Sequence, residues 1–458
     1  MQTSVPDAAS PAASPAAPAR PRRRAPADLP FTFADQALAD TLAAERDEPD
    51  WLREERIAAA EAFAALPVEA NQLYTPYIDL RSAELQDVRP YVLDGPAGLG
   101  DDLRELDLPE TVSVETMSQW LARDPDGFRS TMEGGRTLPA DDKLAMLARG
   151  FWSHGRHVEV PAGVTLDAPI VLRWPSAAPG RALVTRTIVT LGAGASASIV
   201  EEQVACGPAI DCAEGETVPQ GFFHGTTEVV LGAGASLSMA SIQDFGSEQI
   251  AFQHRHATIG EGASLHWALA QLGGRLVRSR VDNRLEGDRS SVEQVEIVFG
   301  GEQQLFDLTS YTRHIGRDTT GNLLSKGALL DRSRSFMKGM ITIERSAVGT
   351  DSFLGEFGMN LSKAARAVAI PSLEIDQPDC RRAAHSSSVG PIDPTQLFYL
   401  ESRGISPDDA RKFIVLGFLE PVVARVPLES ARDRLRDLLD EKWSAGLASG
   451  GASASTAA

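Results

Sequence analysis

The stretch LGAGASASIV (residues 191–200) recurs as LGAGASLSMA (231–240) and as IGEGASLHWA (259–268). Each copy joins a Gly-x-Gly turn to a run in which small or apolar residues alternate with polar ones, which is the period of a β-strand. One such unit cannot bury its apolar face alone, so stacked copies must share a continuous core. The repeat therefore predicts a mainly β protein with a right-handed parallel β-helix at its centre.

A Gly-x-Gly turn could also belong to a dinucleotide-binding loop. A loop that cradles phosphate must lead into a helix whose first amides face the anion. Here the residues that follow, such as SASIVEEQV after Ala195, continue with a period of two and predict strands. Because the turn is also repeated, we interpret it as structural. The chain contains no G-x-x-x-x-G-K-[ST] motif, so we expect no ATPase activity of its own.

The regions on either side of the repeats predict helices. We expect a disordered tail at 1–30, a helical domain at 31–135, the β-helix at 136–378, a second helical domain at 379–446 and a disordered tail at 447–458. The tail at 1–30 is rich in Pro, Ala and Arg and lacks the apolar core of a secretion signal. We therefore predict a cytoplasmic protein.

The sequence near the C-terminus predicts two helices with recognisable start and stop residues. Asp393 and Pro394 form an N-cap and first-turn pair, and Gly404 is a typical helix stop. Ser406 starts a second helix, which we expect Pro421 to interrupt. A final amphipathic helix follows. Its apolar stripe could pack on the protein or face a partner; it consists of Leu428, Leu435, Leu438, Leu439 and Trp443.

Composition limits the classes of function. The chain has 458 residues, 63 acidic and 44 basic side chains, and a net charge of -19. Such a charge repels nucleic acid and anionic membranes, so we expect neither as a partner. Only three cysteines occur, too few for a disulfide framework. No apolar run approaches the roughly 20 residues that span a bilayer.

Few residues have the spacing of metal ligands. His254 and His256 lie two apart in a probable strand and would project from one face, as a metal site or as ordinary packed side chains. Cys206 and Cys212 lie in a probable loop, where two thiolates alone make an incomplete site. Cys380 lies five residues before His385, in a segment rich in Ser and Gly that suits a loop or strand end.

The C-terminal segment supports a family resemblance. His385 is followed by Val389-Gly390, Ile392-Asp393 and LFYLESRGIS (397–406), an order that resembles the SufB/SufD family of iron-sulfur cluster assembly scaffolds, and most of all its SufD branch. The resemblance continues upstream through RTLPADDKLAMLARGFWSHGRHVEVPAGVTLDAPI (136–170) and through the block at 331–375. In all, it covers roughly residues 130 to 440.

This resemblance implies a role and a site. It implies a non-catalytic scaffold that pairs with SufB through the β-helix and binds the ATPase SufC, which supplies ATP hydrolysis. It also implies that His385 offers a nitrogen to a nascent iron-sulfur cluster shared with SufB, with no cofactor bound permanently by this chain. Cys380 is a further candidate ligand, although SufD-like sequences often have a cysteine where this chain has Ala383. The candidate surface for SufC consists of Phe398, Tyr399, Arg403 and Phe413.

Two other functions remain open at this point. The chain could be a SufB-like or homodimeric scaffold of the same family, which its few cysteines disfavour. It could instead be a β-helical carbohydrate-active enzyme, since pectin-degrading enzymes share this architecture. That class needs acidic residues clustered on one face of the solenoid, and the sequence shows no such cluster.

Overall fold

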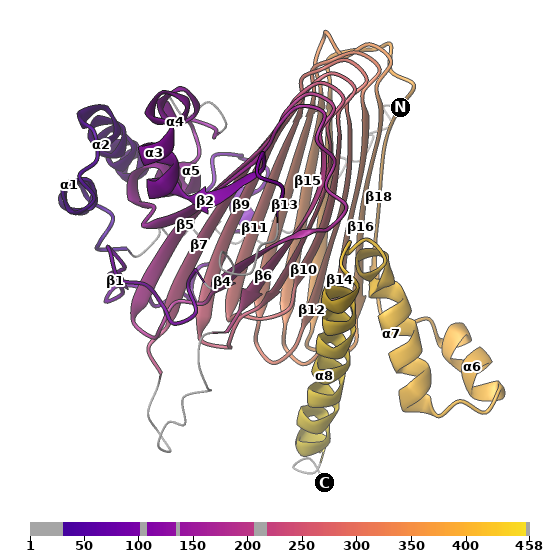
Figure 1. The fold of residues 1–458 in the computed structure, drawn as a ribbon. Helices are drawn as coiled ribbons and strands as arrows, with labels where there is room; N and C mark the ends of the chain where they lie inside the picture. The colour runs from indigo at the N-terminus through magenta and orange to yellow at the C-terminus, as the bar shows by residue number, and fades with distance from the viewer. Residues whose placement is uncertain (1–30, 101–107, 134–137, 206–217, 455–458) are drawn as a thin grey trace, which may run out of the picture.

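The computed structural model describes residues 31–100, 108–133, 138–205 and 218–454, and its centre is a parallel β-solenoid (Figure 1). Each turn contributes one strand to each of two sheets. Sheet A contains β3 (His154–Val160), β5 (Arg181–Leu191), β7 (Gly221–Leu231), β9 (Gln249–Ile259), β11 (Leu276–Leu285), β13 (Leu305–His314), β15 (Arg334–Ile343) and β17 (Arg366–Ile375). Sheet B contains β4 (Ile170–Pro175), β6 (Ser196–Val204), β8 (Ser236–Asp244), β10 (Ser264–Gln271), β12 (Ser291–Gly300), β14 (Thr320–Leu329), β16 (Asp351–Asn360) and β18 (Arg382–Gly390). The predicted parallel β-helix is therefore confirmed.

The two glycines of each repeat have separate structural roles. The second glycine, as in Gly194 with φ +68°, lies in the left-handed region that side chains disfavour. The first glycine permits close stacking, because a Cβ on Gly192 would lie 2.5 Å from the backbone nitrogen of Ala162 in the preceding turn. The Gly-x-Gly pattern is thus a solenoid turn, which agrees with the structural interpretation and excludes the dinucleotide loop.

The three repeats stack in register within sheet B. Ser196 pairs with Ser236, and Ser236 pairs with Ser264. The apolar positions that follow them form one buried cluster inside the solenoid, which includes Leu237, Met239, Leu265 and Trp267. Stacking like residues on like residues is what allows successive turns to share a core.

The N-terminal helices cover the outer face of sheet A, as Figure 1 shows. They are α1 (Gln36–Glu45), α2 (Asp50–Ala65), a short 3-10 helix at Thr75–Tyr77, α3 (Met117–Arg123), α4 (Pro125–Met132) and α5 (Lys143–Phe151). Asp142 caps α5 by accepting a hydrogen bond from the Ala145 amide at 2.7 Å. Phe63 and Phe151 of the helices join Phe222 and Phe252 of the sheet in one buried cluster.

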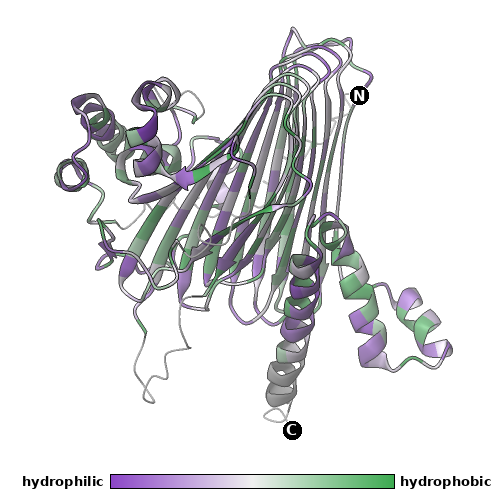
Figure 2. Cartoon of the chain, in the orientation of Figure 1, coloured by the Kyte–Doolittle hydropathy of each residue, from purple (hydrophilic) through white to green (hydrophobic). Residues whose placement is uncertain are grey.

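Three helices follow the solenoid, namely α6 (Pro394–Ser402), α7 (Pro407–Val423) and α8 (Glu429–Ala454). Helices α7 and α8 cover part of the outer face of sheet B. The apolar side of α7 is visible in Figure 2, and it packs with α8 against β10, β12 and β14. Leu435, Leu438, Leu439 and Trp443 are buried there, so the stripe of α8 packs on the solenoid. No helix within the described ranges has a stretch long and apolar enough to cross a membrane.

The prediction that Pro421 interrupts the second helix is wrong. Helix α7 continues through Pro421 to Val423. Proline removes one amide donor, and its ring presses on the residue four positions earlier. That residue is Gly417, and because α7 ends at Val423, the crowding and the lost hydrogen bond fall in the last turn of the helix.

Three boundaries differ from those expected. The strands do not end at 378, because β18 (Arg382–Gly390) lies inside the region assigned to C-terminal helices. Residues 143–151, expected in the β-helix, form α5. Helix α8 runs to Ala454, past residue 446 where a tail was expected to begin. The predicted tail at 1–30 and the pair Cys206 and Cys212 lie outside the described residues.

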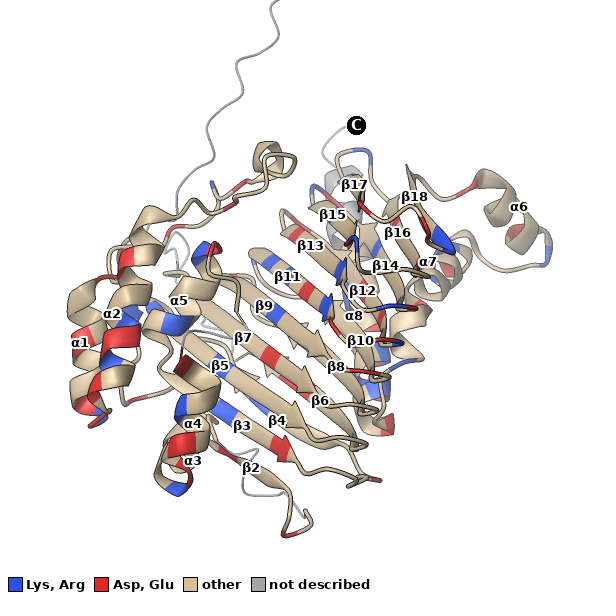
Figure 3. Ribbon diagram, turned by 90° about the horizontal axis from the view of Figure 1, so that it is seen from above, with Lys and Arg blue, Asp and Glu red and all other residues tan. Residues whose placement is uncertain are grey.

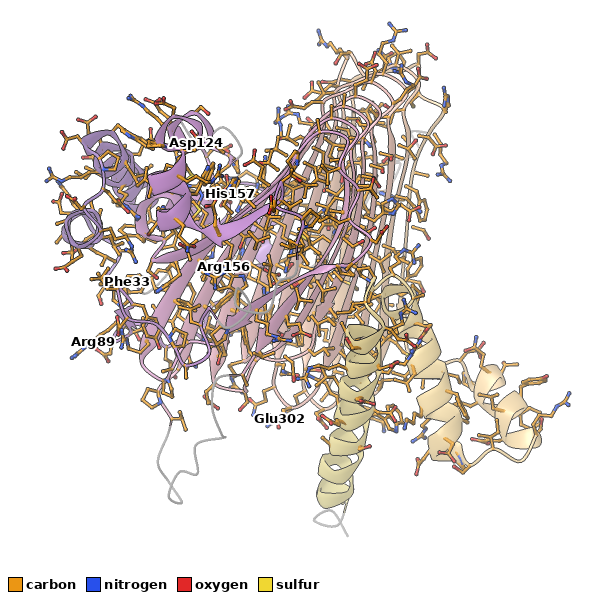
Figure 4. The ribbon with its side chains drawn as sticks, in the orientation of Figure 1. Phe33, Arg89, Asp124, Arg156, His157 and Glu302 are labelled. Carbon is orange, nitrogen blue, oxygen red and sulfur yellow. The ribbon has the colours of Figure 1, made fainter. Side chains whose placement is uncertain are left out.

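The first turn of the solenoid is closed by residues from the N-terminal side. Strand β2 (Ser113–Thr116) pairs antiparallel with β3, while β1 (Arg89–Pro90) pairs with β5. His157 of β3 lies beside α3 in Figure 4 and stacks on Trp120 with ring centres 3.6 Å apart. The guanidinium of Arg156 lies 4.8 Å from the centre of the Trp174 ring. This end of the core is therefore covered.

Candidate functional site at the last turn

His385 lies in the middle of β18, the last strand of sheet B. Its Cα is paired with that of Leu354 in β16. The Ser-rich sequence suggested a loop or strand end, but pairing with β16 holds the segment extended, because strand formation depends on neighbours more than on intrinsic preference. The solenoid therefore positions His385 on a regular element at its final turn.

The imidazole of His385 is exposed and free to bind a ligand. Residues two apart on a strand share a face, so His385 lies on the same face as Ala383 and Val389. Ala383 packs against the interior cluster of Ile341 and Leu354, which identifies this as the inward face of the last turn. Within the described ranges, the side chain of His385 has no hydrogen-bond or ion-pair partner.

Among the described strands, β17 and β18 each have a neighbour on one side only. β17 pairs with β15 and β18 pairs with β16, so each has one edge without a described strand beside it. Ile375 at the end of β17 is 45% exposed and Val389 of β18 is 40% exposed. The last turn thus combines free backbone donors and acceptors, apolar side chains and an imidazole. We call this surface, with its residues Ile375, His385 and Val389, the open end.

Cys380 lies in the turn before β18 and is half-buried. It packs against the interior cluster that contains Ile341 and Leu354. No described hydrogen bond joins it to His385, which faces solvent. The structure therefore places the two predicted ligands in different surroundings, one packed and one open.

Glu356 is a polar group at this end that the sequence did not single out. It is buried one strand below the open end, and its Cα is paired with that of Ser387. Burial raises the pKa of Glu356 to about 8, although a hydrogen bond from the Ile370 amide at 2.7 Å acts in the opposite direction. The only available signal was a Glu at an inward position of a strand, between Leu354 and Gly358.

The four residues predicted to face an ATPase lie on the outermost helices. Phe398, Tyr399 and Phe413 are exposed large apolar side chains. Arg403 is exposed too, with its guanidinium 5.2 Å from the centre of the Tyr399 ring. Helix α6 buries none of its residues and lies farther from the strands than α7 (Figure 1). The structure brings these residues together on one helical pair.

Among the described residues, the protein is a parallel β-solenoid with an unpaired last turn, an exposed histidine on that turn and a projecting helical pair. Residues 175–418 match the family model described as "SUF system FeS cluster assembly, SufBD core domain". The chain belongs to this SufBD family of iron-sulfur cluster assembly proteins. This membership argues against the carbohydrate-active alternative.

Named relatives agree with the family model. The chain is 27% identical over 303 residues to the iron-sulfur cluster assembly protein SufD of Bacillus subtilis, covering 66% of this chain and 67% of that protein. It is 30% identical to a SufBD family protein of Mycobacterium leprae, covering 47% of this chain and 57% of that one. With a similar protein of Mycobacterium bovis the identity is 31%, over 48% and 58%. The matches thus span little more than half of the mycobacterial relatives.

Proposed function

We propose that this chain is a SufD-like scaffold subunit of a SufBCD complex that assembles iron-sulfur clusters in the cytoplasm. In this role it pairs with SufB, binds the SufC ATPase and catalyses no reaction itself. The nascent cluster is a transient cargo shared with SufB, and this chain alone holds no permanent cofactor. The observation that carries the proposal is the open end, where an unpaired histidine lies beside two free strand edges.

The open end supports pairing with a second solenoid. An unpaired strand edge accepts a further strand through main-chain hydrogen bonds. Here two edges, β17 and β18, lie at the same end, so a partner with like strands can continue both sheets. Ile375 and Val389 would lose their exposed apolar surface in such a contact, which favours association.

The position of His385 supports a role in holding iron at that contact. A neutral imidazole nitrogen is a good ligand for iron, but a cluster needs several ligands. One exposed histidine on the terminal turn is suited to complete a site whose other ligands come from the partner. Cys380 is a less suitable second ligand because it is packed in the turn before β18.

The helices α6 and α7 support the binding of a separate ATPase. Phe398, Tyr399 and Phe413 expose large apolar areas on a helical pair that packs on the strands mainly through α7. Grouped exposed aromatic side chains with a nearby arginine are typical of binding surfaces. We assign SufC to this surface, with Arg403 as its cationic member.

The test combines co-purification with substitution of His385. The chain carrying His385→Ala should still co-purify with SufB and SufC from the native host, while maturation of iron-sulfur proteins is lost. His266→Ala is the matched control, because His266 is a half-buried histidine on a strand of sheet B, 3.7 Å from Glu293. Unchanged maturation with His385→Ala would contradict the ligand role.

A mixing experiment separates SufD-like from SufB-like or homodimeric function. The purified chain mixed with SufB should form a heterodimer, detected by its mass in light scattering. A homodimer that persists in excess SufB would contradict the assignment and favour the homodimeric alternative.

A further inference from the structure

A second group of metal-binding residues lies far along the chain from His385, on the outer face of sheet A. His254 and His256 of β9 and Asp282 of β11 each offer a ligand atom, and these atoms lie within 4.8 Å of one another. Register brings them together, since His256 pairs with Asp282 across the two strands. All three are buried beneath the N-terminal helices, and Figure 3 shows acidic and basic residues along these strands.

The two imidazoles have nitrogen atoms that no protein group uses. The Nδ1 atoms of His254 and His256 are buried and accept or donate no hydrogen bond within the described residues. A buried polar atom without a partner costs free energy, so such atoms need an explanation. A neutral imidazole coordinates a metal ion through a nitrogen of this kind.

The distances suit an ion of moderate size. His254 Nε2 lies 2.7 Å from Asp282 Oδ2. Donors bound to zinc lie about 2.1 Å from the ion, which sets them about 3.4 Å apart in its usual tetrahedral arrangement. An ion between the two atoms therefore requires only a small separation, and it would replace the proton that the two groups now share. Asp142 lies 3.8 Å from His254 Nδ1, where an outer carboxylate orients a metal-bound histidine.

The charges of the neighbouring buried side chains favour the binding of a cation. Asp142 and Asp282 are both buried, and Arg280 contacts both, with its Nε 2.7 Å from Asp282 Oδ2. One guanidinium thus balances two carboxylates and leaves one negative charge in the group. Arg280 repels a second cation, and the buried carboxylate of Asp142, which also lies 3.8 Å from His254 Nδ1, offsets part of that repulsion.

A cavity gives access to this group. It has a volume of about 420 Å³ and is lined by His256, Arg280, Asp282 and Tyr311. Two histidines and one carboxylate with open positions are the ligand set of many Fe(II) sites, and nitrogen and oxygen ligands also suit zinc. The cavity supplies the open positions.

We propose that His254, His256 and Asp282 form a binding site for a divalent transition-metal ion of the Fe²⁺ and Zn²⁺ class. The remaining coordination positions face the cavity. This site is independent of His385 and of the proposed pairing with SufB. It would link strands β9 and β11 beneath helix α5.

The test titrates the metal-free full-length chain with Co²⁺, followed by visible absorption, and then displaces the Co²⁺ with Zn²⁺. We expect one equivalent to bind at this site and His256→Ala to weaken that binding by more than about 100-fold. The control His266→Ala should bind the same equivalent as the unaltered chain. Loss of binding with His385→Ala alone would place the ion at the open end and overturn the proposal.

Heat stability gives a second measure that does not depend on spectra. Zn²⁺ should raise the unfolding temperature of the unaltered chain and leave that of His256→Asn unchanged, since binding only to the folded state stabilises it. Circular dichroism verifies that the variant is folded. Equal shifts in both chains, or no Co²⁺ uptake by the unaltered chain, would overturn the proposal.

Discussion

The two ends of the solenoid are built from the same repeating turn and finish in opposite ways. At the first turn, the inward residues Ile170, Leu172 and Trp174 are at most 1% exposed. At the last turn, the apolar residues Ile375 and Val389 are 45% and 40% exposed. In sheet A the first turn is extended by β2, whereas among the described strands β17 and β18 have no strand beyond them. Strand β4 is also an edge strand of sheet B, but its inward side chains are buried. One end of the core is therefore covered within the chain, and the other leaves apolar side chains exposed.

This difference shows that a repeat protein needs additional segments to cover its terminal turns. A solenoid must cover both terminal turns, because its repeats bury their faces only against neighbours. The N-terminal domain covers one of them with aromatic contacts such as His157 on Trp120. Leaving the other uncovered has a cost in exposed apolar surface, which the proposed pairing with SufB would bury.

The largest loss of stability should come from a substitution at the first turn of the solenoid. Trp174→Ala removes a buried ring from beneath Arg156 and should lower the free energy of unfolding by about 3–5 kcal/mol. Denaturant titration measures this loss. Val389→Ala at the open end is the matched control and should cost less than about 1 kcal/mol. Equal losses at the two ends would remove the distinction between them.

The next effect is a pH dependence at the open end. Burial raises the pKa of Glu356 from its usual 4.5 to about 8, so between these pH values the folded state holds a proton that the unfolded state releases. Stability should therefore fall as pH rises through this window, by on the order of 3 kcal/mol. Glu356→Gln cannot ionise and should remove that fall.

Thermal unfolding at a series of pH values measures this behaviour. Glu374→Gln is the control, because Glu374 is an exposed acid on the neighbouring strand β17. A Glu356→Gln variant whose pH profile matches that of the unaltered chain would show that this carboxyl is not desolvated.

A third effect concerns association. Val389→Asp places a charge on the inward face of the last turn and should weaken binding to SufB by about 100-fold, or about 2.8 kcal/mol. Ser388→Asp changes the next residue, which faces the other way, and should weaken binding less than about 5-fold. Titration by calorimetry gives both constants. Equal weakening by the two variants would place the contact elsewhere.

The smallest effect is expected from His385. Because its side chain is exposed and has no partner among the described residues, His385→Ala should change the free energy of unfolding by less than about 0.5 kcal/mol. Denaturant titration checks this. A loss above about 2 kcal/mol would show a structural histidine and weaken its assignment as a ligand.

Sequence patterns predicted the solenoid because three turns carry glycine at both critical positions. The pattern did not predict two further turns. In these turns Gly287 and Gly316 also approach the backbone of the preceding turn closely. In these turns the residue with positive φ is Arg289 or Asp318, at 58° and 55°. Non-glycine residues tolerate this conformation when neighbouring turns hold them, and the simple pattern is then lost.

The candidate sites, too, could be predicted from the sequence only in part. The shared face of His254 and His256 followed from strand period alone, and the structure bears it out. Asp282 could not be added, because its pairing with His256 depends on the length of the loop between two turns. Likewise, His385 is exposed because β18 is the last described strand of sheet B. The sequence did not predict this strand, because its Ser- and Gly-rich segment is typical of a loop.

The register between turns has a consequence for dimensions. Neighbouring strands in a sheet lie about 4.8 Å apart, so each turn adds that distance between the N-terminal domain and the open end. The number of turns therefore sets the distance between the N-terminal domain and the open end. Removing one whole turn, for example from Gly260 to Glu286, would bring the two ends closer by one strand spacing and leave the chemistry of each end unchanged.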